Sequence, residues 1–444
     1  MMQKNDGPLL LRLMGKIGSV MFACLLVAAC ATGPEPGARE IVRRDIPAFD
    51  YPYDNPWIAT VLRTPESQLA PRSEAPRRDA TLQVFPDREV PEGFWYYRGL
   101  NYSYFAQPHP APMIFMIAGT GADSRSGLMD SLGRILHHAG FHVVLLPSPT
   151  HSNFIVTAST TYLPGNGPQD AADLYRVMRM IHGELSRSLE ITETHLAGYS
   201  LGAWHAAFTA KLDEEEKALN FQRVLLLSPP LSLYHSLVTV EQFLLNNLPG
   251  GIDSLDHFLD QAIQRIALVF QNTDAMDFSD EDYALQSLLQ TTFGDERLAA
   301  AVGLSFRLAS ANMVFTADVM RRMGYVFPRD LPFRSTTPLG RYLGISLRVS
   351  FLDYFDDVFS AYYGGEPGLD LIEQSSLNSI GEYLSRSEKI GMLTSRDDII
   401  LGPGDLEQLQ ALFGERAWIF PQGGHLGSLE HRAVAAHLVN FFIQ

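Results

Sequence analysis

The sequence predicts an α/β fold with a mostly parallel central sheet, flanking helices and a large helical insertion. Three observations support this. Short apolar runs alternate with amphipathic helical segments over residues 80–230. From Leu231 to Ser385 the pattern is helical and carries almost no strand signal, and the alternation resumes over 386–444. Strands that alternate with helices indicate βαβ units and a parallel sheet, so we expect one α/β domain that the insertion interrupts.

The predicted strands are short runs of apolar, β-branched or aromatic residues. The run at Pro112–Ala118 is apolar throughout, as expected of a strand that is buried on both faces of a parallel sheet. The eight predicted strands are Ala80–Phe85, Phe94–Phe105, Pro112–Ala118, Phe141–Leu146, Thr194–Ala197, Arg223–Leu227, Lys389–Thr394 and Arg416–Phe420.

The predicted helices have apolar residues at helical spacing and polar residues between them. In the α/β part they are Ser124–His138, Gln169–Leu185, Ala203–Lys211, Asp405–Phe413 and Leu429–Phe442. In the insertion they are Leu255–Phe270, Glu296–Met323 and Leu339–Tyr363. We expect the insertion, residues 231–385, to form a cap over the carboxyl edge of the sheet, because its apolar stripes must be buried somewhere.

Composition and charge exclude several classes of protein. The chain has 444 residues, of which 46% are hydrophobic and 19% charged, which is ordinary for a globular protein. Its formal net charge of −16 disfavours contact with a phosphate backbone, so we expect no nucleic-acid partner. Cys24 and Cys30 are the two cysteines, so the body has no disulfide, thiol nucleophile or cysteine metal site.

The N-terminus has the features of an export signal. Three basic residues precede Ile17–Ala29, a mostly apolar stretch of 13 residues that is too short to span a membrane. The segment 26–30, Leu-Val-Ala-Ala-Cys, resembles a bacterial lipobox. That resemblance implies a signal peptide over 1–29, lipidation of Cys30 and attachment to the cell envelope. Because Ala31 follows, it implies the outer membrane, facing the periplasm. Cleavage after Ala29 or Ala31 by an ordinary signal peptidase is the alternative, and Met14 is an alternative start.

Residues 30–79 follow as a predicted tether between the anchor and the body. Two polar, proline-rich stretches, 31–37 and 71–78, indicate a linker. Tyr51, Tyr53 and Trp57 lie between those stretches and suggest that part of the tether packs on the body.

A candidate nucleophile lies in Gly198-Tyr-Ser200-Leu-Gly202, a G-x-S-x-G motif between a predicted strand and a predicted helix. This spacing suits a serine on a strained strand-to-helix turn, where glycines two residues away avoid clashes with the neighbouring strand and helix. By itself the motif is weak, since glycine and serine are common here. A tight turn without catalytic role is the alternative.

His425 is the candidate general base among 13 histidines. It lies in Pro421-Gln-Gly-Gly-His425-Leu-Gly427, between the last predicted strand and helix. Such a loop lies at the carboxyl edge of the sheet, where open α/β sheets place their ligands. Five other histidines fall in predicted helices or at a strand start and suit packing or capping roles: His137, His138, His142, His182 and His205. We predict no metal site and no cofactor.

The carboxylate that would orient the imidazole comes from Ser395-Arg-Asp397-Asp398, directly after a strand. The position three residues after Ser395, before an apolar pair, favours Asp398, and Asp397 is the competing choice. An acid after the strand at Arg223–Leu227 is another solution, for which Glu241 is the nearest candidate and lies too far along the chain to be attractive.

Two backbone N–H groups should stabilise the oxyanion. We expect them at Leu201, after the nucleophile, and at Thr120, in the turn after the strand at Pro112–Ala118. The same turn, Gly119-x-Gly121-x-x-Ser124, is similar to a dinucleotide fingerprint. It lacks the third glycine and an acid after the next strand, which disfavours nucleotide binding.

With Ser200, Asp398 and His425 in this chain order, the sequence resembles the α/β-hydrolase superfamily over about 80–230 and 386–444. The serine motif and the Gly-Gly-His-x-Gly loop are most similar to esterase/lipase and serine-aminopeptidase-like members. The superfamily commonly has His-Gly at the oxyanion turn, whereas this chain has Ala118-Gly119. The resemblance implies a lid at the position of the insertion.

The expected function is therefore an envelope-anchored serine hydrolase that cleaves a carboxylic ester through an acyl-enzyme. Its expected partners are a small-molecule or lipid ester and, through the lipid anchor, a membrane. A peptidase or an acyltransferase is the alternative within the enzyme class. A non-catalytic envelope protein that uses the fold for binding is the alternative outside it, but a binding module has no need of all three catalytic groups.

Overall fold

The computed structural model describes residues 43–248, 294–364 and 371–444, and a few positions between 250 and 261. The predicted signal peptide, Cys30 and most of the predicted helix at Leu255–Phe270 lie outside the described residues. Eight strands form one sheet in the order β1-β2-β4-β3-β5-β6-β7-β8. They are β1 (Arg78–Leu82), β2 (Leu100–Phe105), β3 (Ala111–Ile117), β4 (His142–Leu146), β5 (Ile191–Tyr199), β6 (Val224–Leu227), β7 (Ile390–Ser395) and β8 (Ala417–Phe420).

The strands β3 to β8 run parallel, and β2 pairs antiparallel with both β1 and β4. This strand order, with an antiparallel second strand and a sharp turn into a helix after β5, is the α/β-hydrolase fold. The predicted fold class is confirmed. Two predicted strands are too long. The first, Ala80–Phe85, ends at Leu82 in the structure. In the second, Phe94 belongs to a 3-10 turn at Glu92–Phe94, and only Leu100–Phe105 pairs in the sheet.

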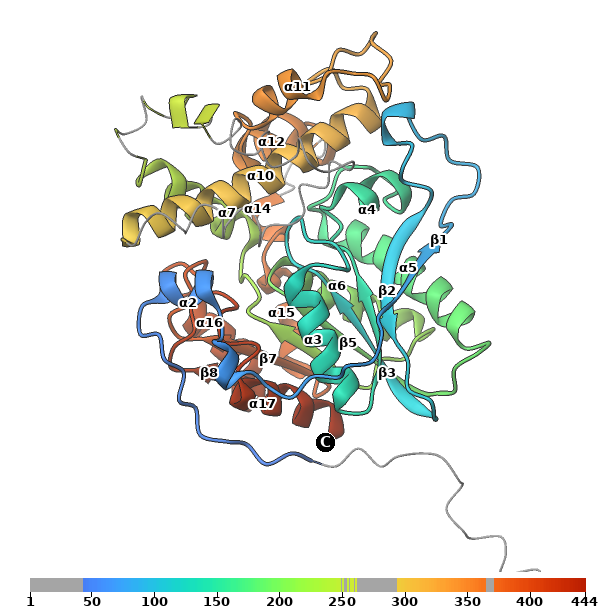
Figure 1. Ribbon diagram of the computed structural model, residues 1–444, viewed down its shortest axis with the longest axis vertical. Coiled ribbons are helices and arrows are strands. Elements are labelled where there is room, and N and C mark those ends of the chain that lie inside the picture. Colours follow the sequence, from blue (N-terminus) through green and yellow to red (C-terminus); the bar gives the residue numbers. More distant parts are fainter. Residues whose placement is uncertain are drawn as a thin grey trace, which may run out of the picture. The chain divides into compact units, whose positions relative to one another are not determined.

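Helices cover both faces of the sheet (Figure 1). One face packs against α3 (Gly127–His138) and α17 (Arg432–Ile443). The other face packs against α5 (Gly167–Leu185), α6 (Leu201–Glu216) and α16 (Asp405–Phe413). Neighbouring residues of a strand enter opposite clusters, as Ile114 and Phe115 do, which is why the strands read as continuous apolar runs.

Between β6 and β7 the described residues form helices and add no strand to the sheet. The long helices α7 (Leu233–Leu245) and α10 (Asp295–Arg321) lie together with α11 (Leu339–Ser346) and α12 (Phe351–Tyr354) in Figure 1. A π-helical turn at Phe355–Phe359, α13 (Ser360–Tyr363), α14 (Leu371–Gln374), a 3-10 turn at Leu377–Ile380 and α15 (Gly381–Arg386) follow.

The prediction of one helix over Leu339–Tyr363 is wrong, because α11 ends at Ser346 and a separate helical segment begins at Phe351. Ser350 caps α12 in a capping box, in which its side chain accepts from Asp353 N–H and the Asp353 carboxylate accepts from Ser350 N–H. The cap starts a new helix, four residues after α11 has ended at Ser346.

Of the described helices, α10 is long and apolar enough to cross a membrane, with a mean hydropathy of 1.5 over its most apolar window. However, 67% of that window is buried within the protein. Helix α10 therefore has the character of a core helix of the insertion.

The segment predicted as a tether is part of the folded body from Arg44 onward. Arg44 and Asn440 of α17 exchange two hydrogen bonds of 2.7 and 2.8 Å. Helix α2 (Pro56–Leu62) follows, with the Asn55 side chain capping its first N–H groups and proline at its first position. The buried side chain of Tyr51 helps to hold the segment on the body, so the described part of the predicted tether, from Arg44 onward, is not a free linker.

Candidate active site

Ser200 lies on the turn between β5 and α6, at φ 52° and ψ −125°, a conformation that is strained for a residue other than glycine. Neither flanking glycine could carry a side chain, because neighbouring backbone atoms lie too close. A Cβ on Gly198 would lie 2.2 Å from the carbonyl oxygen of Gly202, and a Cβ on Gly202 would lie 2.2 Å from that of Ile117 in β3. The turn therefore has the geometry of a nucleophile elbow.

His425 lies in the loop between β8 and α17, and its imidazole reaches the serine. The distance from His425 Nε2 to Ser200 Oγ is 2.9 Å, across 225 residues of sequence. Both side chains are buried. The structure thus brings together the serine and the histidine that the sequence singled out.

The structure distinguishes the two competing carboxylates. The Asp398 oxygens lie 2.9 and 3.1 Å from His425 Nδ1. The Asp397 carboxylate instead accepts hydrogen bonds from the backbone N–H groups of Gly423 and Gly424, at 3.2 and 2.9 Å. Asp398 is therefore the carboxylate that contacts the imidazole, and Asp397 holds the backbone of the same loop.

Two further donors fix the Asp398 carboxylate, whose side chain is fully buried. Thr394 Oγ1 donates to Oδ2 at 3.2 Å, and Ile400 N–H donates to Oδ1 at 3.2 Å. For Asp397, burial raises the pKa of the carboxyl, and the hydrogen bonds from Gly424 and Gly423 oppose that shift. Both carboxylates are thus held by their surroundings in a single orientation.

The two predicted oxyanion donors, Leu201 and Thr120, line the same pocket. Among the hydrogen bonds of the described residues, none is donated by the backbone N–H of either residue. Gly119 lets the turn approach the elbow, since a Cβ there would lie 2.7 Å from the Tyr199 ring. Gly121 N–H donates to Thr150 Oγ1 at 2.8 Å, which holds the turn from behind.

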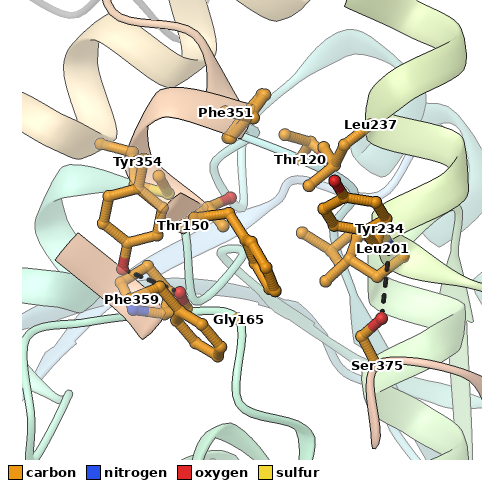
Figure 2. A pocket seen from close by; sticks show the side chains of 14 residues that line it. Thr120, Thr150, Gly165, Leu201, Tyr234, Leu237, Phe351, Tyr354, Phe359 and Ser375 are labelled. Carbon is orange, nitrogen blue, oxygen red and sulfur yellow. Dashed lines mark hydrogen bonds between the residues drawn. The ribbon is translucent and has the colours of Figure 1, made fainter. Parts of the chain in front are cut away.

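An apolar pocket adjoins the elbow and is walled by the insertion (Figure 2). Tyr354 and Phe359 lie on one side of it, and Leu201, Tyr234 and Leu237 lie opposite. Tyr354 OH donates to the carbonyl oxygen of Pro164 at 3.0 Å, which ties α12 to the α/β domain. The lining residues are Thr120, Thr150, Pro164, Gly165, Leu201, Leu233, Tyr234, Leu237, Met313, Phe351, Tyr354, Phe355, Phe359 and Ser375.

The aromatic wall was not predicted residue by residue. Phe355 and Phe359 belong to the π-helical turn, and π-helical turns often occur at functional sites. The extra residue in such a turn shifts the faces that its side chains occupy, so a search for helical periodicity in the sequence does not find it.

Two of the other histidines and the alternative acid have structural partners. His205 Nε2 lies 3.1 Å from Asp170, with both groups buried, and His142 Nδ1 accepts from Gln107 N–H at 3.0 Å. Glu241 pairs with the buried Arg307 of α10, away from His425. Within the described part of the chain, no group of three or more His, Cys, Asp or Glu is placed to hold a metal ion.

The chain was compared with protein families, curated proteins and solved structures, and only solved structures are similar to it. No protein family matches the sequence, and no curated protein is similar to it. An esterase of Pyrococcus furiosus is 8% identical, with 85% of this chain and 98% of that one covered and a TM-score of 0.42. A fungal esterase from Rhizomucor miehei is 11% identical (87% and 93% covered, TM-score 0.40), and a bacterial membrane phospholipase A is 18% identical (82% and 86%, TM-score 0.38).

Proposed function

We propose that this protein is a serine hydrolase that cleaves a carboxylic ester through an acyl-enzyme. The observation that carries the proposal is the continuous chain of contacts from Ser200 Oγ through His425 to Asp398, with 2.9 Å at each link. Because these groups come from three separate segments of sequence, their alignment at hydrogen-bond distance on a strained turn is not expected of a purely structural cluster.

In the first half-reaction, the Ser200 hydroxyl attacks the ester carbonyl carbon while His425 Nε2 accepts its proton. Asp398 keeps the Nδ1 proton in place, so that Nε2 is the free base, and it stabilises the imidazolium that forms. The oxygen that becomes negative is held by the N–H groups of Leu201 and Thr120. The tetrahedral intermediate collapses, the alcohol leaves with the proton from His425, and the acyl group stays on Ser200.

In the second half-reaction a water molecule takes the place of the alcohol. His425 accepts a proton from the water as its oxygen attacks the acyl carbon. The intermediate then releases the carboxylic acid, and the proton returns from His425 to Ser200. Every proton transfer passes through Nε2, so the reaction needs no group beyond those of the site and water.

The apolar pocket supports an ester whose acyl part is hydrophobic. It begins at the two oxyanion donors and continues between Leu237, Phe351, Tyr354 and neighbouring rings. An acyl chain bound there would exchange water for aliphatic and aromatic contacts, at up to about 0.8 kcal/mol for each CH₂. The insertion thus serves as the cap of the site and sets the length of acyl chain that fits.

The N-terminal sequence supports a proposal for the location. We place the enzyme in a bacterial cell envelope, anchored through a lipidated Cys30, because an apolar segment of signal-peptide length ends in Leu-Val-Ala-Ala-Cys. The outer membrane, facing the periplasm, is the proposed location.

The decisive experiment is labelling with an active-site-directed fluorophosphonate, combined with hydrolysis of p-nitrophenyl esters. The wild-type protein should be labelled at Ser200, and Ser200→Ala should lose both labelling and turnover with an unchanged circular dichroism spectrum. Ser395→Ala is the matched control, because that buried serine lies on β7 and contacts Ser428 rather than His425. Labelling of Ser200→Ala at the wild-type rate would refute the proposal.

A further inference from the structure

Thr60 of helix α2 contacts the backbone of the histidine itself. Its Oγ1 accepts a hydrogen bond from His425 N–H at 2.9 Å and donates one to the Pro56 carbonyl oxygen at 2.7 Å. Since the hydroxyl proton is engaged within α2, an oxygen lone pair faces the loop. The hydroxyl is thus oriented as an acceptor for His425.

The loop that carries His425 needs such support. Gly423, Gly424 and Leu426 have φ values of 147°, 57° and 69°, so positive-φ residues lie on both sides of the histidine. Leucine in this conformation is strained, and strained backbone persists only where the surroundings hold it. Thr64, one turn further along the chain, adds a second contact, donating from Oγ1 to the Gly427 carbonyl oxygen at 3.0 Å.

Helix α2 and the loop are also in direct backbone contact. A Cβ on Gly424 would lie 2.3 Å from the Pro56 carbonyl oxygen, and one on Gly427 would lie 2.1 Å from that of Ala59. The loop therefore cannot move toward α2. On the other side, the Asp397 carboxylate holds the N–H groups before His425. The histidine backbone is fixed between these two supports.

The same helix contacts the insertion. Trp57 packs edge-on against Phe243 of α7, with ring centroids 4.7 Å apart. Asn55 Nδ2 donates to Asp295 Oδ1 at the start of α10, at 2.7 Å. Val61 packs against apolar side chains of α10. One short helix thus contacts both the loop of the proposed base and the helices that wall the pocket.

We infer that Thr60 is a positioning residue for His425, and that α2 fixes the imidazole relative to Ser200 and to the insertion. The inference rests on the proposed function, since it assigns Thr60 a part in that reaction. Helix α2 lies in the segment that the sequence predicts to be a tether, and it would then be one of the elements that set the geometry of catalysis. Loss of the Thr60 acceptor would leave His425 N–H buried without a partner and release the loop.

The test replaces Thr60 by valine, which keeps the shape and removes the hydrogen bond, and by serine, which keeps the hydroxyl. Thr60→Val should lower kcat and the rate of fluorophosphonate labelling about ten- to a hundredfold, because a small misplacement of a catalytic group costs that much. KM should change less than twofold, since Thr60 does not line the pocket. Thr60→Ser should restore most of kcat. Leu62→Ala, on the exposed side of α2, is the control and should leave kcat unchanged.

The pH profile separates positioning from general damage. In Thr60→Val the acid limb of kcat/KM should move, because the contact of His425 with Asp398 is disturbed, whereas mere destabilisation lowers the melting temperature and leaves that limb in place. Thr60→Ala is the second variant if valine prevents folding. The inference would be overturned if a folded Thr60→Val or Thr60→Ala variant kept the kcat and the acid limb of the wild-type protein. It would also be overturned if Thr60→Ser lost as much kcat as Thr60→Val. A wild-type protein that is not labelled would instead refute the proposed function.

Discussion

Replacing Asp398 by asparagine should reverse the tautomer of His425. Each Asp398 oxygen accepts two hydrogen bonds: Oδ1 from His425 and Ile400 N–H, and Oδ2 from His425 and Thr394. In the variant, Ile400 N–H requires the amide oxygen at the Oδ1 position, so the amide NH₂ occupies the Oδ2 position beside the imidazole. An NH₂ group there favours Nδ1 as an acceptor, which moves the ring proton to Nε2.

With the proton on Nε2, the imidazole cannot accept the Ser200 proton. We expect kcat to fall by roughly 10³–10⁴, as loss of the correct tautomer does in serine proteases, which corresponds to about 4–5.5 kcal/mol. The assay is p-nitrophenyl ester hydrolysis, with the active enzyme counted by fluorophosphonate titration. Asp397→Asn is the matched control and should cost far less, because Asp397 contacts the loop backbone and not the ring. A loss below tenfold for Asp398→Asn, or a greater loss for Asp397→Asn, would refute the assignment.

Three further outcomes are expected. Arg307→Met should destabilise the fold by about 3 kcal/mol at neutral pH, because it leaves Glu241 buried without its partner. Burial raises the pKa of Glu241, and Arg307 opposes that shift. In Arg307→Met the fold should therefore lose stability as the pH rises above the pKa of a free glutamate carboxyl, and it should regain stability toward acid pH. Thermal unfolding at several pH values measures this. An ester series should show kcat/KM rising up to about fourfold per CH₂ until the pocket is full, and a flat profile would contradict the acyl-pocket proposal. Cys30→Ser should move the protein from the detergent to the aqueous phase on partitioning, and equal partitioning would exclude the lipid anchor.

The centre of the sheet was predictable because strands such as β4, β6 and β7 are buried on both faces. A strand such as β3 can be recognised as an unbroken run of apolar residues. Each of the strands β3 to β8 either has ends within two residues of the predicted ends or is longer than predicted. The helix break at Ser350 was also readable, since Ser350 and Asp353 have capping-box spacing. The apolar residues before and after Ser350 keep the spacing of a continuous helix, so the periodicity of the sequence does not indicate the break.

The site was predictable only in part, since sequence supplies residue types and not distances. Ser200 and His425 have glycine patterns that mark their turns. Asp397 and Asp398 are adjacent, and which of them faces the ring depends on a turn geometry that no spacing fixes. Thr60 has no local signal, because its role arises from the docking of α2 against a loop 365 residues away. The cap signal at Asn55 and Pro56 marks the helix but not its partner.

The described N-terminal segment joins the body close to the C-terminal helix α17. Arg44 joins α17 at Asn440, near the chain end, and the Gln444 carbonyl oxygen accepts from Arg223, which directly precedes β6. The segment therefore meets the body near the amino edge of the sheet, whereas Ser200 lies at the carboxyl edge. Thirteen residues lie between Cys30 and Arg44, and these fourteen Cα–Cα steps reach at most about 50 Å when fully extended. If Cys30 carries the proposed lipid, the anchor joins the body at the edge of the sheet opposite Ser200, and this reach limits the distance between the active site and the membrane.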